Sequence, residues 1–354
     1  MERIWWERVP NALNFVSAAV NHLLQEKSVV IQYGGALPWR DFFLCAVQNA
    51  LQENDCSKSV KSISHTGEPG LFLLETFCPA EKRAAYRPSK SYAKFLAESS
   101  DIVLHGHYIF AAAETDDELR RWEDFISEYI RERGRGREKA GFMILYHGPR
   151  LLSLKKGVSC LSFDEAVTEY DRIVFATLAA ASLDSAPLIK SYLTELTASL
   201  LGNDVELCAA CVRRADDFLQ DPRRLIQEIA AAQVRSDGTA FAFDRPEAEV
   251  SALIWRAQIR SIYPRLEEYR EKFIERHYVE LKRLLPIEAA PVEIYSEPED
   301  LELGKLVYLA GAQRLILKPE EYDRLEKYKN ARNSLSHLSP LPYADIRTLG
   351  LGGR

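Results

Sequence analysis

Short apolar runs alternate with amphipathic stretches in the first half of the chain. The runs are rich in β-branched or aromatic residues and predict buried strands at 29–33, 70–79, 101–113 and 141–148. Apolar residues at helical spacing predict helices within 1–27, over 39–51 and over 115–135. Strands that alternate with helices are typical of a parallel sheet flanked by helices, so the predicted fold class is α/β.

The second half is dominated by helical periodicity. Predicted helices cover 185–201, 204–219, 221–234, 246–262, 264–285 and 319–337. The stretch 171–182 fits either a strand or a helix, and 286–300, with several prolines and acids, is predicted to be a loop. An all-α region is therefore expected after the α/β region.

Composition restricts the class of protein. The chain has 354 residues, 47% of them hydrophobic, and a net charge of -6. These values suit a soluble globular protein and argue against general coating of nucleic acid, although a local basic site stays compatible with them. No apolar run approaches the ~18 residues of a membrane helix. The charged N-terminus lacks the apolar segment of a signal peptide, so a cytoplasmic location is predicted.

Two pairs of potential metal ligands are present. Cys208 and Cys211 have the spacing of half a zinc site, but no second pair follows, so both are interpreted as buried residues on a helix. His105 and His107 are two residues apart on a predicted strand, and no third ligand has a suitable local spacing. Neither a metal nor a cofactor is predicted.

The stretch from Ser28 to Phe43, SVVIQYGGALPWRDFF, has the strand, glycines and helix of a phosphate-binding loop. Together with the later strands and helices, it resembles the layout of P-loop NTPases of the AAA or STAND type over residues 1–234. The resemblance implies an α/β domain over 1–164 and a helical lid over 165–234. An unrelated α/β sheet that begins with a glycine turn is the alternative.

The catalytic residues of that family are missing from this sequence. No lysine stands between Gly34 and Arg40, and Asp41 stands near the place of the magnesium-binding hydroxyl. The histidines His105 and His107 occupy the predicted place of the family's carboxylates. We therefore interpret Gly34, Gly35, Arg40 and Asp41 as a degenerate nucleotide loop and expect no ATPase activity.

Near the C-terminus the sequence RNSLSH lies in a predicted helix. It resembles the Arg-x4-6-His signature of HEPN domains, which implies a helical domain over 245–340. In an active member, Arg332 would clamp the scissile phosphate, His337 would transfer protons and Asn333 would orient them, with the RNA 2′-hydroxyl as nucleophile. Active members often dimerise. A structural role for the motif, in folding or in dimerisation, is the alternative.

These resemblances imply a non-hydrolysing, NTPase-like scaffold or regulatory subunit. Similar combinations occur in bacterial defence and stress-response systems. The alternative function is a metal-independent endoribonuclease that uses Arg332 and His337, and a nucleotide sensor that binds without hydrolysis is a third. The expected partner is another protein or a second copy of the chain, with RNA as a further candidate and no membrane.

Overall fold

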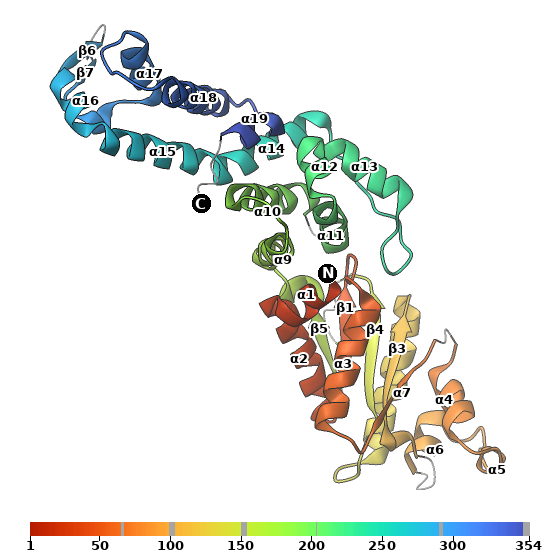
Figure 1. The fold of residues 1–354 in the computed structure, drawn as a ribbon. Helices are drawn as coiled ribbons and strands as arrows, with labels where there is room; N and C mark the ends of the chain where they lie inside the picture. The colour runs from red at the N-terminus through yellow and green to blue at the C-terminus, as the bar shows by residue number, and fades with distance from the viewer. Residues whose placement is uncertain (65–66, 99–102, 150–153, 203, 290–292, 350–354) are drawn as a thin grey trace. The chain divides into compact units, whose positions relative to one another are not determined.

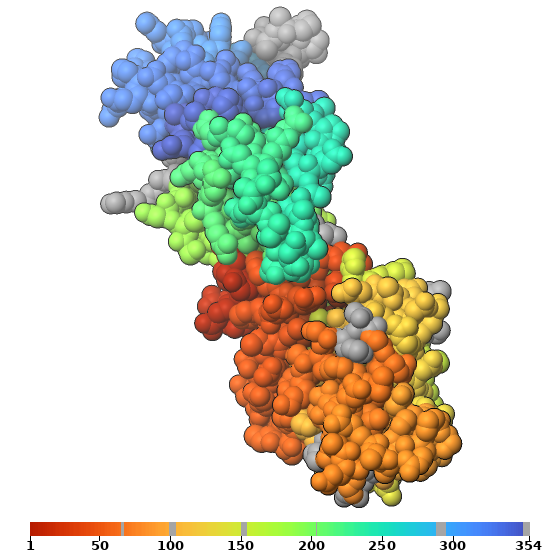
Figure 2. Space-filling model, turned by 90° about the vertical axis from the view of Figure 1, so that its right-hand side faces the viewer, coloured from red at the N-terminus to blue at the C-terminus, as the bar shows by residue number. Residues whose placement is uncertain are grey.

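The computed structural model describes residues 1–64, 67–98, 103–149, 154–202, 204–289 and 293–349. The chain divides into two compact units, Met1–Asp171 and Arg172–Arg354. Residues of the first unit run from red to yellow-green in the space-filling view, and those of the second from green to blue (Figure 2).

The first unit is built on one parallel sheet (Figure 1). Its order is β2-β3-β4-β1-β5, and every neighbouring pair is parallel. The strands are β1 (Ser28–Tyr33), β2 (Ser59–Ser62), β3 (His107–Ala113), β4 (Gly141–His147) and β5 (Val158–Ser162). The predicted fold class, a helix-flanked parallel sheet followed by a helical region, is confirmed.

The central strands are apolar because both of their faces are covered. In β1 all six residues are buried, and β4 is buried from Gly141 to Tyr146. Val30 of β1 pairs with Ile144 of β4. A continuous apolar run without alternation is the pattern expected for an interior parallel strand.

Helices cover the two faces of the sheet (Figure 1). One face carries α1 (Glu2–Arg8), α2 (Pro10–Leu24) and α3 (Arg40–Asn54), and the other carries α4 (Pro69–Phe77), α6 (Tyr92–Glu98) and α7 (Asp116–Arg133). The latter helices share one apolar core with β3 and β4. The short helices α5 (Ala80–Arg83) and α8 (Phe163–Ala166) lie in the connections.

One strand prediction for this unit was wrong, one was right only in part, and two strands were not predicted. The run 70–79 forms helix α4, because Pro69 takes the first helical turn and Leu73 and Leu74 are buried on one side. Of the predicted strand 101–113, residues 101 and 102 lie outside the described residues, 103–106 form a 3₁₀ turn, and β3 begins only at His107. The strands β2 and β5 were not predicted, since both are short and only partly buried.

The second unit is helical, as predicted. Its helices are α10 (Pro187–Leu201), α11 (Val205–Arg213), α12 (Ala215–Gln220), α13 (Pro222–Ala232), α14 (Glu247–Ser261), α15 (Tyr263–Arg276), α16 (Tyr278–Leu284), α17 (Leu303–Gly311), α18 (Pro319–Ser336) and α19 (Tyr343–Thr348). Helix α9 (Glu169–Ala181) begins at the end of the first unit and resolves the ambiguous stretch 171–182 as helix.

One predicted loop of the second unit contains regular structure. Within 286–300, the strands β6 (Ile287–Ala289) and β7 (Glu293–Tyr295) form an antiparallel hairpin, and Pro298–Asp300 form a 3₁₀ turn. Helix α10 packs on α14, and the amide of Gln258 in α14 bonds both Tyr192 of α10 and the backbone of Leu341. The division into a lid over 165–234 and a HEPN-like domain over 245–340 stays a prediction.

Candidate functional site

The loop after β1 is the segment that the sequence predicts to be a degenerate phosphate-binding loop. Gly34 lies directly after the strand, and four residues separate it from Trp39, Arg40 and Asp41. This is the spacing of G-x4-G-K-[ST], with tryptophan, arginine and aspartate in the last three places. Trp39 has φ 45° and ψ 55°, the left-handed conformation that favours glycine. Spacing alone could have identified Arg40 as the residue in the lysine position.

The interior of this loop is filled by its own side chains. Leu37 and Pro38 are buried, and the Trp6 indole Nε1 donates a 2.9 Å hydrogen bond to the Pro38 carbonyl oxygen. Trp6 packs on the rings of Phe43 and Phe163. Phosphate-binding loops present a series of backbone N–H groups to the ligand, whereas Pro38 has no N–H to present.

A carboxylate already occupies one backbone donor of the loop. The Gly34 N–H donates a 2.6 Å hydrogen bond to Oδ2 of Asp164 in α8. A Cβ atom at Gly34 would lie 3.1 Å from that oxygen, so only glycine allows this close approach without displacing the carboxylate. The negative charge of Asp164 also disfavours a phosphate group beside Gly34.

The two charged residues that follow the loop face each other. Arg40 Nε lies 3.9 Å from Asp41 Oδ1, with 41% and 88% of the two side chains exposed. An ion pair this exposed contributes little to stability. It does place a carboxylate next to Arg40, which weakens the attraction of this guanidinium for a phosphate.

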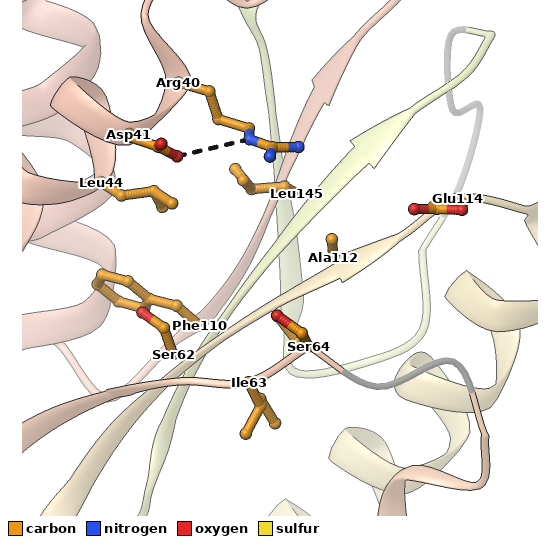
Figure 3. A pocket seen from close by; sticks show the side chains of 11 residues that line it. Arg40, Asp41, Leu44, Ser62, Ile63, Ser64, Phe110, Ala112, Glu114 and Leu145 are labelled. Carbon is orange, nitrogen blue, oxygen red and sulfur yellow. Dashed lines mark ion pairs between the residues drawn. The ribbon is translucent and has the colours of Figure 1, made fainter. Parts of the chain in front are cut away.

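A pocket of about 570 Å³ opens beside Arg40 at the carboxyl ends of the strands (Figure 3). In open α/β sheets this edge is the usual place for a ligand. Its wall combines one cation, two carboxylates and two hydroxyls with apolar side chains. The lining residues are Arg40, Asp41, Leu44, Ser62, Ile63, Ser64, Phe110, Ala111, Ala112, Glu114 and Leu145.

The carboxylate expected after β3 is present, which corrects the sequence interpretation. His107 is the first residue of β3 and His105 precedes it, so both lie at the amino end of the strand. The residue after the carboxyl end is Glu114, which lines the pocket. Its backbone N–H donates to Glu118, whose own N–H donates to Thr115 Oγ1 at the start of α7. The sequence analysis placed the start of this strand too early and therefore did not identify Glu114 as the residue after its end.

His107 has local partners of its own. Its Nδ1 lies 2.7 Å from the Ser59 hydroxyl, and its ring packs on Phe77 with centroids 4.8 Å apart. Burial lowers the pKa of His107. Within the described residues, no group of three His, Cys, Asp or Glu side chains has the geometry to hold a metal ion.

Cys208 and Cys211 lie on the buried side of α11. Their side chains are 2% and 0% exposed, and burial raises the pKa of Cys211 to about 12. A protonated, inaccessible thiol is neither a good nucleophile nor a good metal ligand. The burial matches the interpretation of the pair as packing residues.

The RNSLSH residues lie at the end of α18, and the side chains of Arg332 and His337 do not converge on one site. Arg332 donates a 3.0 Å hydrogen bond to Glu302 Oε2, which holds its guanidinium. His337 is the exposed residue that ends the helix. Five positions along a helix correspond to about 140° around its axis, so these side chains leave α18 in different directions. Asn333 is partly buried between them. Their catalytic roles stay a prediction.

Three comparisons with known proteins were made. No family model matches the chain, and no curated protein does. Among solved structures, a protein described as Rhizobiales Trip13 aligns with a TM-score of 0.32 and 13% identity. The alignment covers 65% of this chain and 79% of that one.

In the described part of the chain, no helix is both long and apolar enough to cross a membrane.

Proposed function

We propose that the α/β unit is a non-hydrolysing, NTPase-like module that serves as a scaffold or regulatory subunit. The observation that carries the proposal is the closed loop 34–39. Pro38 lies where a donor is needed and is held by Trp6, while Asp164 occupies the N–H of Gly34. A chain that can neither cradle phosphates nor place a free cation on them has no means of stabilising phosphoryl transfer.

The charge of the neighbouring pocket supports the same proposal. Among the described residues of its wall, the carboxylates Asp41 and Glu114 outnumber the cation Arg40. Without a bound metal, two carboxylates repel the several negative charges of a nucleoside triphosphate. A partner protein or a second copy of the chain is the expected binding partner, and a role in bacterial defence or stress response remains part of the proposal by resemblance.

We expect no release of phosphate from ATP by the purified protein with magnesium. The double variant Arg40→Lys/Asp41→Thr restores the two side chains that the loop lacks, and it should also be inactive, because Pro38 still provides no donor. A malachite-green assay measures the release. Light scattering with and without ATP should give the same oligomeric state. Magnesium-dependent turnover that is lost in Asp41→Ala, or assembly driven by ATP, would contradict the proposal.

The ribonuclease alternative makes a different prediction. If the motif is structural, the wild type should not cleave single-stranded RNA in EDTA. Arg332→Ala should lower the free energy of unfolding by at most about 1 kcal/mol, because its ion pair with Glu302 is partly exposed. Gel electrophoresis of a labelled RNA and thermal melting measure the two effects. Cleavage that disappears in His337→Ala at unchanged stability would establish the ribonuclease instead.

A further inference from the structure

Basic residues gather at the amino edge of the sheet, opposite the pocket. Lysine precedes four of the five strands by one or two residues: Lys27 before β1, Lys58 before β2, Lys139 before β4 and Lys156 before β5. Because all five strands are parallel, their amino ends meet at one edge. We call these four lysines, together with Arg135 and Arg137, the basic edge.

The strand register places these lysines at nearly the same height along the direction of the strands. Ser59 pairs with His107, and Tyr108 pairs with Gly141, which places Lys58 level with Lys139. The Lys58 ammonium donates a 3.0 Å hydrogen bond to the Lys139 carbonyl oxygen. Ser28 pairs with Val158, so Lys27 and Lys156 are within one residue of each other along the sheet. Five strands at about 4.8 Å spacing make this edge roughly 20 Å wide.

The turn from α7 to β4 adds two arginines to this edge. The segment 131–139, RERGRGREK, has five basic and two acidic residues in a chain whose net charge is -6. Arg135 and Arg137 are exposed and flank Gly136. Gly134 and Gly136 have φ of 76° and 79°, and nothing lies within 4 Å of a Cβ built on either. The turn therefore projects into solvent.

Most cations of the basic edge are not neutralised. Within the described residues, only Lys139 has a carboxylate at ion-pair distance, with Glu26 Oε2 3.6 Å from its ammonium. Lys27 bonds the neutral amide of Gln25, and Lys58 bonds a carbonyl. Two of the nearby acids have their own cations, because Arg131 pairs with Glu132 and Lys155 with Asp124. Asp55, which precedes Lys58, accepts hydrogen bonds from the Ser57 and Tyr108 hydroxyls.

We infer that the basic edge binds the phosphate backbone of a nucleic acid. Arginine forks and lysine ammonium groups spread over roughly 20 Å suit a row of phosphates rather than one small anion. A membrane surface fits less well, because membrane-binding surfaces insert apolar side chains. In the described part of the first unit, the exposed large apolar residues are Leu13, Leu71 and Tyr170. None of them flanks the start of a strand. Because no exposed aromatic group of the described residues lies at this edge to stack on bases, binding should not depend on sequence.

The test is the fluorescence anisotropy of a labelled single-stranded DNA of about 20 nucleotides, titrated with the full chain at several salt concentrations. For single strands each phosphate contact contributes about 0.7 to the magnitude of the slope of log K against log salt. One contact therefore raises the binding constant by a factor of about 8 at 50 mM salt, relative to 1 M salt. The double variant Arg135→Gln/Arg137→Gln should therefore weaken binding roughly 60-fold at that salt, and the magnitude of the slope should fall by about 1.4.

The matched control is Arg256→Gln/Arg314→Gln, which removes the same charge from exposed arginines of the second unit. It should bind like the wild type, and melting curves should show that both variants are folded. Equal weakening by both variants would overturn the proposal, as would absence of binding by the wild type at low salt. Preference for vesicles that contain phosphatidylserine over DNA would also overturn it, because it would identify a lipid surface as the ligand.

Discussion

Replacing Trp6 with alanine is expected to lower the free energy of unfolding by about 3–5 kcal/mol, the usual cost of truncating a fully buried aromatic residue. Trp6 is 1% exposed and fills the space between Phe43 and Phe163 under the loop. Its loss also leaves the buried Pro38 carbonyl without its donor. Chemical denaturation followed by circular dichroism measures the change.

Two further variants separate packing from hydrogen bonding at this site. Trp6→Phe keeps most of the ring and loses the indole N–H, so its cost should be smaller, about 1–3 kcal/mol. Leu13→Ala on the neighbouring helix α2 removes a side chain that is 43% exposed and should cost less than 1 kcal/mol. If Trp6→Ala lowered the free energy of unfolding no more than Leu13→Ala, the contacts of Trp6 would not be what stabilises the closed loop.

A second large effect is expected in the helical unit. The Gln258 side chain is fully buried and makes three hydrogen bonds, one to the Tyr192 hydroxyl and two to the backbone of Leu341. Gln258→Leu keeps a similar volume but leaves the N–H and C=O of Leu341 buried without partners. Each such group costs about 1–3 kcal/mol, so a loss of roughly 2–6 kcal/mol is expected.

Thermal melting of three variants checks this prediction. Tyr192→Phe removes only one of the three hydrogen bonds and should cost about 1 kcal/mol. Arg256→Gln lies on the exposed side of the same helix and should change stability by less than about 0.5 kcal/mol. A melting temperature for Gln258→Leu equal to that of Arg256→Gln would show that the amide does not join α14 to the segment after α18.

Elements with strong internal patterns were predictable from the sequence. The interior strands β1 and β4 are continuous apolar runs, and α7 combines regular apolar spacing with an acidic first turn capped by Thr115. Helix α18 begins at Pro319, as predicted. For such segments the local sequence and the tertiary environment favour the same structure, so no distant contact is needed to decide between helix and strand.

Elements at the border of the sheet were not predictable in the same way. The β2 sequence, SVKS, is polar and mostly exposed, and becomes a strand because its backbone pairs with β3. The run 70–79 is apolar enough for a strand, yet it forms a helix whose buried side packs in the core beside α6 and α7. Backbone pairing with β3 decided the first outcome and burial in the core decided the second, rather than intrinsic propensity.

The sequence by itself determined that the loop after β1 has glycines at its start and lacks the lysine and hydroxyl of a phosphate-binding loop. Only the tertiary structure decided that the loop is closed. The donor to Pro38 lies 32 residues earlier in the chain, and the carboxylate on Gly34 lies 130 residues later. Local patterns carry no information about such partners, because it is the order of the strands that brings these distant segments to one edge of the sheet.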